Sequence, residues 1–126
     1  MIKEVEFKIW DRDFTLPVYF ETFKDMDVIK VQETALNTLL QNKEWIDAAL
    51  SSVQEYSKKA LLEDKTNNKK DNVFSYVKPE SLFIECVPNN PRVAIMCKYR
   101  YDLEHGLAII FSNDGRVEVG LQDIIL

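Results

Sequence analysis

The chain has 126 residues, of which 46% are apolar and 29% are charged, and its formal net charge at pH 7 is −5. This length is that of one ordinary domain, and the apolar share is enough for a core without disulfides or metals. The acidic surplus argues against nucleic-acid binding, because such proteins gather Lys and Arg on one face. No apolar run approaches the roughly 18 residues that a membrane helix needs. We therefore expect a single domain over residues 1–126 that is cytoplasmic and has no membrane segment.

The first twenty residues are predicted to form a hairpin of two strands. Residues 2–10 alternate apolar and charged side chains, which is the period of a half-buried strand. Residues 11–13 are polar and predict the turn, and residues 14–20 alternate again. Pro17 has no amide hydrogen for a strand ladder, so the second strand is expected at a sheet edge or with a bulge.

Apolar residues at three- and four-residue spacing then predict two helices. The first is expected to begin at an N-cap on Asp27 and to break at Asn42. The second is expected over residues 43–63. Two helices of this length with apolar stripes cover a sheet more often than they form a coiled-coil seam, so we interpret the stripes as core-facing surfaces.

The second half of the chain is predicted to be mostly strand. Residues 64–72 are a polar loop, and Asp71 is expected to cap a short third helix that Pro79 ends. Four further strands are predicted at residues 82–87, 93–101, 107–111 and 116–119. The order ββ-αα(α)-ββββ with short connections predicts an α+β fold, in which helices pack on one face of a mixed or predominantly antiparallel sheet.

The two cysteines, Cys86 and Cys97, both fall inside predicted strands. In a reducing compartment we interpret them as free, buried thiols. Two cysteines and the single histidine do not make the usual four-ligand zinc site. We expect no metal and no cofactor.

The one candidate for chemistry is the group Asp102, Glu104 and His105. A histidine beside two carboxylates can act as a general base whose ring a carboxylate orients. The competing interpretation is a tight turn, in which Asp102 and Gly106 supply the backbone conformations and His105 has a structural role. No serine or cysteine lies in a nucleophile elbow, and no glycine-rich loop precedes a helix, so the chain offers little else for catalysis.

The last 28 residues resemble an uncharacterised family of small bacterial domains of unknown function. Its members end in a signature of the form Asp-x-Glu-His-Gly-Leu, followed by Val-x-Val-Gly-x-Gln-Asp-Ile-x-Leu. The matching residues here are Asp102, Glu104, His105, Gly106, Leu107, Phe111, Val117, Val119, Gly120, Gln122, Asp123, Ile124 and Leu126. Such domains are similar to the small proteins that accompany bacterial polymorphic-toxin genes, so the resemblance implies an immunity-like role.

These observations lead to three hypotheses. The first is a non-catalytic protein-binding module, immunity-like, whose acidic surface or sheet edge docks on a basic partner that long-range attraction steers to it. The second is a hydrolase that uses the cluster Asp102, Glu104 and His105. The third is a structural homo-oligomer that pairs through the Pro17 strand or the helical stripe. The first hypothesis agrees best with the charge balance.

Overall fold

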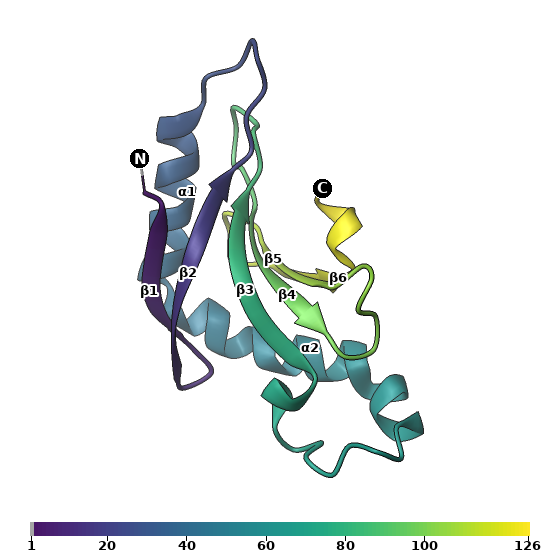
Figure 1. The fold of residues 1–126 in the computed structure, drawn as a ribbon. Helices are drawn as coiled ribbons and strands as arrows, with labels where there is room; N and C mark the ends of the chain where they lie inside the picture. The colour runs from purple at the N-terminus through teal and green to yellow at the C-terminus, as the bar shows by residue number, and fades with distance from the viewer. Residues whose placement is uncertain (1) are drawn as a thin grey trace.

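The computed structural model describes residues 2–126 and shows an α+β fold, in which one sheet of six strands carries two helices on one face (Figure 1). Two short 3-10 helices complete it, one before the third strand and one at the carboxyl end. The elements are β1 (Glu4–Ile9), β2 (Arg12–Phe20), α1 (Ile29–Gln41), α2 (Lys43–Glu63), η1 (Val73–Ser75), β3 (Val77–Ile84), β4 (Val93–Tyr99), β5 (Leu107–Phe111), β6 (Val117–Gly120) and η2 (Gln122–Ile124).

The strands lie side by side in the order in which they occur in the chain, from β1 to β6. Every neighbouring pair is antiparallel except β2 and β3, which are parallel over three residue pairs beginning at Val18 and Leu82. The two helices form the connection between these parallel strands, as a parallel pair needs a crossover. The prediction of a predominantly antiparallel sheet with helices on one face is confirmed.

The first hairpin turns one residue earlier than predicted. Ile9 pairs with Arg12, so the turn consists of Trp10 and Asp11, whose φ angles are +50° and +69°. Two positive φ values are typical of the tight turn that matches strand twist, and glycine or asparagine normally fills it. Trp10 occupies this conformation because its ring is anchored: Nε1 donates to the Ile46 carbonyl at 2.9 Å and the ring packs against Phe74.

The expectation that Pro17 marks an edge strand is wrong, since β2 lies between β1 and β3. The amide of the next residue, Val18, donates to the Lys3 carbonyl on the β1 side. Because amides alternate sides along a strand, the Pro17 nitrogen faces the other way, where the ladder with β3 begins only at Val18. Pro17 therefore lies at a position where the ladder does not require a backbone N–H.

The helices follow the sequence pattern closely, with one change at the start. Helix α1 begins at Ile29 with Val28 at its N-cap position, and Asp27 contributes only a long 3.4 Å contact to the Ile29 amide. The buried side chain of Gln32 ties α1 to the sheet, because its Nε2 lies within hydrogen-bond distance of the carbonyl oxygens of Glu21, Ile84 and Glu85. Asn42 separates the two helices as predicted.

The predicted third helix is only a 3-10 turn, Val73–Ser75, and its cap is Asn72 rather than Asp71. Pro79 does not end a helix. It lies inside β3, which starts at Val77, at an irregularity where the register with β4 shifts between Pro79 and Ser81. A bulge is one of the few places in a strand that tolerate proline.

Both faces of the central strands are buried, but by different elements. The main core lies between the sheet and the helices. On the opposite face a small cluster of Ala94, Met96, Ala108 and Ile110 packs with Ile125, which follows η2. Figure 1 shows this carboxyl-terminal turn standing over the sheet on the side away from the helices. The apolar end of the chain is thus held down at Ile125, whereas Leu126 is 70% exposed.

Candidate functional site

The predicted cluster lies in the turn that joins β4 to β5. Both oxygens of the Asp102 carboxylate lie 3.0 Å from His105 Nδ1, and Oδ1 also accepts the His105 backbone amide at 3.1 Å. The Gly106 amide donates to the Asp102 carbonyl at 2.9 Å, which closes the turn. Two of the three predicted residues therefore meet. Glu104 is exposed, and none of the hydrogen bonds of this turn involves its carboxylate.

The pair is electrostatically matched. The hydrogen bond and charge of Asp102 raise the pKa of His105 above its ordinary value of 6.5, and the charges of Glu104 and Asp123 act in the same direction. The backbone hydrogen bond from His105, and then its side chain, hold the pKa of Asp102 below the usual range. Both side chains are in contact with solvent, at 47% and 28% exposure. The arrangement favours a charged imidazolium over a free base.

Gly106 and Gln122 lock this turn to the carboxyl end of the chain. The Gln122 side chain donates from Nε2 to the Cys97 carbonyl at 3.1 Å, and its backbone amide donates to the His105 carbonyl at 3.3 Å. Gly106 has a φ of +66°, and a Cβ on it would lie 2.6 Å from Gln122 Nε2 and 2.8 Å from the Cys97 oxygen. Glycine is required there on both counts.

The remaining signature residues have packing roles or stay exposed. A Cβ on Gly120 would lie 2.6 Å from Ile124 Cδ1, the end of a flexible side chain, so Gly120 and Ile124 pack closely where η2 follows β6. Asp123 is exposed in η2 and its charge acts on His105 only at a distance. The signature Asp102, Glu104, His105, Gly106, Gly120, Gln122 and Asp123 thus surrounds one structural junction, where η2 closes over the β4–β5 turn.

The chemical capacity of the junction is limited. The acid–histidine pair has the geometry that orients an imidazole, but among residues 2–126 Asp102 is the only side chain hydrogen-bonded to His105. The thiol of Cys97 is buried and donates to the Ile95 carbonyl, and burial raises its pKa. Cys86 is also free and buried, as predicted. Within residues 2–126 no three His, Cys, Asp or Glu side chains gather as a metal-binding group.

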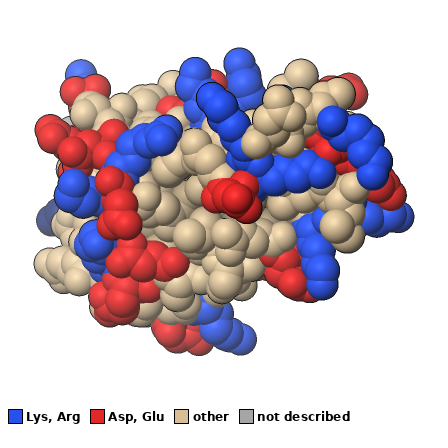
Figure 2. All heavy atoms as spheres, turned by 90° about the horizontal axis from the view of Figure 1, so that it is seen from below, with Lys and Arg blue, Asp and Glu red and all other residues tan. Residues whose placement is uncertain are grey.

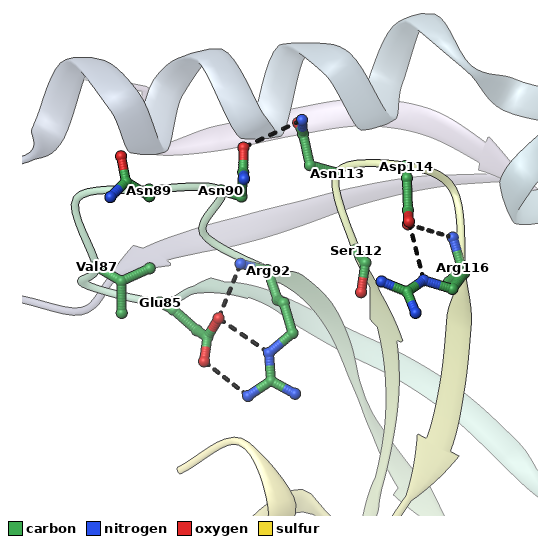
Figure 3. Close-up of a pocket in the computed structure, with 9 residues that line it drawn as sticks. All are labelled: Glu85, Val87, Asn89, Asn90, Arg92, Ser112, Asn113, Asp114 and Arg116. Carbon is green, nitrogen blue, oxygen red and sulfur yellow. Dashed lines mark hydrogen bonds and ion pairs between the residues drawn. The ribbon is translucent and has the colours of Figure 1, made fainter.

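A polar cleft of about 420 Å³ lies at the opposite end of β4, between the β3–β4 and β5–β6 turns (Figure 3). Arg92 spans Glu85 with two side-chain hydrogen bonds of 2.9 and 2.7 Å, and its backbone amide donates to the same carboxylate. Burial raises the pKa of Glu85, but the bonds from Arg92 outweigh this and hold it below the usual value. Asp114 pairs with Arg116 at 2.9 Å. Each arginine of the cleft forms an ion pair with a carboxylate of the same cleft, so these charges are balanced. The Asn113 side chain donates to the Asn90 side chain and links the two turns.

A second exposed feature is the connection between β2 and α1, which projects beyond the end of the sheet (Figure 1). Phe23 and Met26 face each other across a tight turn there, with the Met26 amide donating to the Phe23 carbonyl at 3.1 Å. Paired residues across such a bridge point their side chains the same way. Phe23 is 55% exposed and Met26 40%. Acidic residues Asp25 and Asp27 flank this pair, which we name the apolar tip.

The apolar tip is not among the candidate sites predicted from the sequence. The available signal was two large apolar side chains three residues apart among acidic ones. Connections between elements run over the protein surface, so large apolar residues in a short polar connection are expected to be exposed.

The element order ββααββββ, with a carboxyl-terminal turn packed on the sheet face away from the helices, defines a small α+β domain. The described residues contain no recognisable catalytic constellation. The chain belongs to the family described as a domain of unknown function (DUF6985), whose model matches residues 1–126. No curated protein and no solved structure matches the chain. None of the described helices is both long and apolar enough to cross a membrane.

Proposed function

We propose that this protein is a non-catalytic binding module of immunity-like type, which docks the apolar tip on a basic partner protein. The observation that carries the proposal is the exposed pair Phe23 and Met26 at the end of a projecting connection. Aromatic and methionine side chains that are exposed when free are the usual anchors of protein interfaces. Because each is about half exposed, its burial in a partner contributes about 1 kcal/mol before the costs of association.

The charge around the tip identifies the kind of partner. The exposed Asp25 and Asp27 lie next to it in the chain against the single Lys24, and the whole chain carries a net charge of −5. Opposite charge on the partner raises the association rate and excludes other acidic proteins. The partner that fits is a protein with an apolar pocket ringed by Lys and Arg, such as a surface that normally binds nucleic acid. Occupation of that surface would neutralise such a protein without any chemistry.

The test is a pull-down from cells of the source organism with three tagged proteins: wild type, Phe23→Ser/Met26→Ser, and the control Leu62→Ser. Leu62 is 67% exposed on α2 and matches the change in apolar surface at another place. Because the replaced side chains are exposed, each variant is expected to keep its stability within about 0.5 kcal/mol. Circular dichroism and thermal unfolding check this.

We expect one basic protein to co-elute in fixed stoichiometry with wild type and Leu62→Ser, to be released by salt, and to be lost from the tip variant. Light scattering of the eluate gives the mass of the complex. Wild type that elutes alone would overturn the proposal, and so would a partner that the tip variant retains. A homodimer of the tagged protein in the eluate would favour the homo-oligomer hypothesis instead.

A further inference from the structure

Another cleft lies at the end of the sheet opposite the apolar tip. It has a volume of about 310 Å³ and is formed by η1, the start of β3, the end of β4 and the β4–β5 turn. Its charged side chains are Lys78, Lys98 and Arg100, and its apolar ones include Phe74 and Leu103. No carboxylate lines it. We name it the basic cleft.

The two lysines of the basic cleft are placed against each other. Lys78 and Lys98 are direct partners in the antiparallel ladder of β3 and β4, and both are exposed. Like charges at directly opposite positions destabilise a sheet. Among residues 2–126 neither lysine forms an ion pair, although Glu80 is exposed two positions beyond Lys78. This repulsion is an energetic cost that a bound anion would remove.

Arg100 is held in a fixed orientation beside the lysines. Its Nε donates to Asp64 Oδ2 at 2.9 Å and its Nη2 donates to Thr66 Oγ1, also at 2.9 Å. Asp64 is itself fixed by hydrogen bonds from Thr66 and from the Tyr101 hydroxyl, and those bonds, the Thr66 side chain first, lower its pKa. An arginine held by partners on two of its nitrogens loses little freedom when its remaining nitrogen meets a ligand.

The apolar part of the cleft is also open. Leu103 is 72% exposed and stands at the rim, in the turn that carries the signature residues. Phe74 forms part of the wall and is only partly buried. Figure 2, which views the molecule from below Figure 1, shows Lys and Arg side chains along much of the top and right of this end, with Asp and Glu side chains at the left, in the middle and among the basic ones on the right. The lining itself holds three basic side chains, in a chain whose net charge is −5.

From these observations we infer that the basic cleft binds a small organic anion, namely a carboxylate or phosphate group carried on an apolar or aromatic body. The oxyanion lies between Lys78 and Lys98 within reach of Arg100, and the apolar body lies against Leu103 and Phe74. The two lysines, together with the remaining guanidinium nitrogen of Arg100, whose charge Asp64 balances, give charge-assisted hydrogen bonds, which are the strong ones. The inference is independent of the proposed function, because it concerns a different surface.

The test uses the full chain and four probes: phenyl phosphate, phenylacetate, inorganic phosphate and the uncharged benzyl alcohol. Binding is followed by amide chemical shifts in NMR titrations up to the millimolar range that suits small ligands. The variants are Lys78→Gln/Lys98→Gln, Leu103→Ala, and the control Lys58→Gln/Lys59→Gln. The control removes two exposed lysines of α2 and so changes the net charge equally.

We expect the two aromatic anions to bind saturably and to shift the amides around Lys78, Lys98 and Leu103. Their affinity is expected to fall about tenfold or more in Lys78→Gln/Lys98→Gln, which corresponds to the loss of one strong polar contact, and to stay unchanged in the control. Leu103→Ala is expected to weaken the aromatic anions more than inorganic phosphate.

Several results would overturn the inference. They are the absence of saturable shifts for both aromatic anions, equal weakening in the control, and binding of benzyl alcohol as tight as that of phenylacetate. Inorganic phosphate that binds as tightly as phenyl phosphate would show an adventitious ion only. Thermal unfolding verifies that the double variant folds, and relief of the lysine repulsion predicts that its melting temperature equals or exceeds that of wild type.

Discussion

At the scale of single residues, the best-defined feature is Gln122, whose amide nitrogen satisfies the Cys97 carbonyl. Replacement by alanine removes this hydrogen bond at a partly buried place, which costs about 0.5–1.5 kcal/mol. Gln122→Glu is expected to be at least as destabilising, because a carboxylate would face the carbonyl oxygen. Urea unfolding measures both changes. Asp123→Asn alters the exposed neighbouring residue and is expected to leave stability unchanged, and equal losses in all three variants would contradict the role of Gln122.

The pair of His105 and Asp102 predicts a pH dependence of stability with a definite sign. The pKa of His105 is raised in the folded protein, so the folded state binds the proton more tightly than the unfolded state. Its contribution is complete below the unfolded pKa, about 6.5, and is lost as pH rises through the folded value. Asp102 has a lowered pKa, so its contribution is present at neutral pH and is lost only in acid.

The measurement for this pair is the free energy of unfolding in urea from pH 5.5 to 8, for wild type and His105→Gln. Wild type is expected to lose stability as pH rises across this window, and the variant to lose less. Because both side chains are exposed to solvent, high salt is expected to reduce the difference. Parallel curves for the two proteins would show that the pair has no linkage to folding.

At the scale of elements, the carboxyl-terminal turn that follows η2 covers the second face of the sheet through Ile125. Ile125 is 7% exposed and packs on Ala94, Met96, Ala108 and Ile110. Ile125→Ala is expected to destabilise the protein by about 2 kcal/mol, the low end of the range for buried isoleucine, because the cluster is small. Thermal unfolding measures this. Leu126→Ala, one residue further and 70% exposed, is the matched control and is expected to change little. A loss as large in the control would mean that the turn is held in some other way.

Most elements were predictable because their signals are local. Residues 2–10 alternate with the period of a strand, and residues 43–63 have the apolar spacing of a helix. The structure places β1 and α2 in these two segments. The failures occurred where a long-range contact decided the local conformation. Trp10 occupies a turn position with positive φ because Ile46 and Phe74 hold its ring, and nothing near it in the sequence indicates this. From the sequence alone, Pro79 predicts the end of a helix, whereas in the structure its pairing with β4 places it inside a strand.

The candidate sites differ in the same way. The sequence brought Asp102 and His105 together, since residues three apart in a turn lie close. It did not reveal that Gln122 closes this turn, although both belong to the signature, because that contact joins β4 to the end of the chain. The basic cleft was equally hidden. Lys78 and Lys98 become neighbours only through the register of β3 and β4, and the register is set by the buried face of the sheet.

At the scale of the whole molecule, the hairpin of β1 and β2 joins the rest of the sheet through the shortest ladder. Its ladder with β3 has three residue pairs, beginning at Val18 and Leu82, against seven between β3 and β4. Local opening follows the weakest attachments, so the amides of this hairpin are expected to exchange with deuterium before those of β4 and β5. Native-state hydrogen exchange tests this, and equal protection throughout the sheet would contradict it.

The parallel pair also has a consequence for how the chain assembles. Strands β3 to β6 are joined by short turns and can form early, whereas β2 reaches β3 only after both helices have brought it back. We therefore expect the hairpin to be the last part of the sheet to form. Until it does, β3 is an unprotected edge, and the hairpin of a second copy fits that edge as well as its own. Exchange of amino-terminal arms between molecules is thus the misassembly to which this topology is most exposed at high concentration.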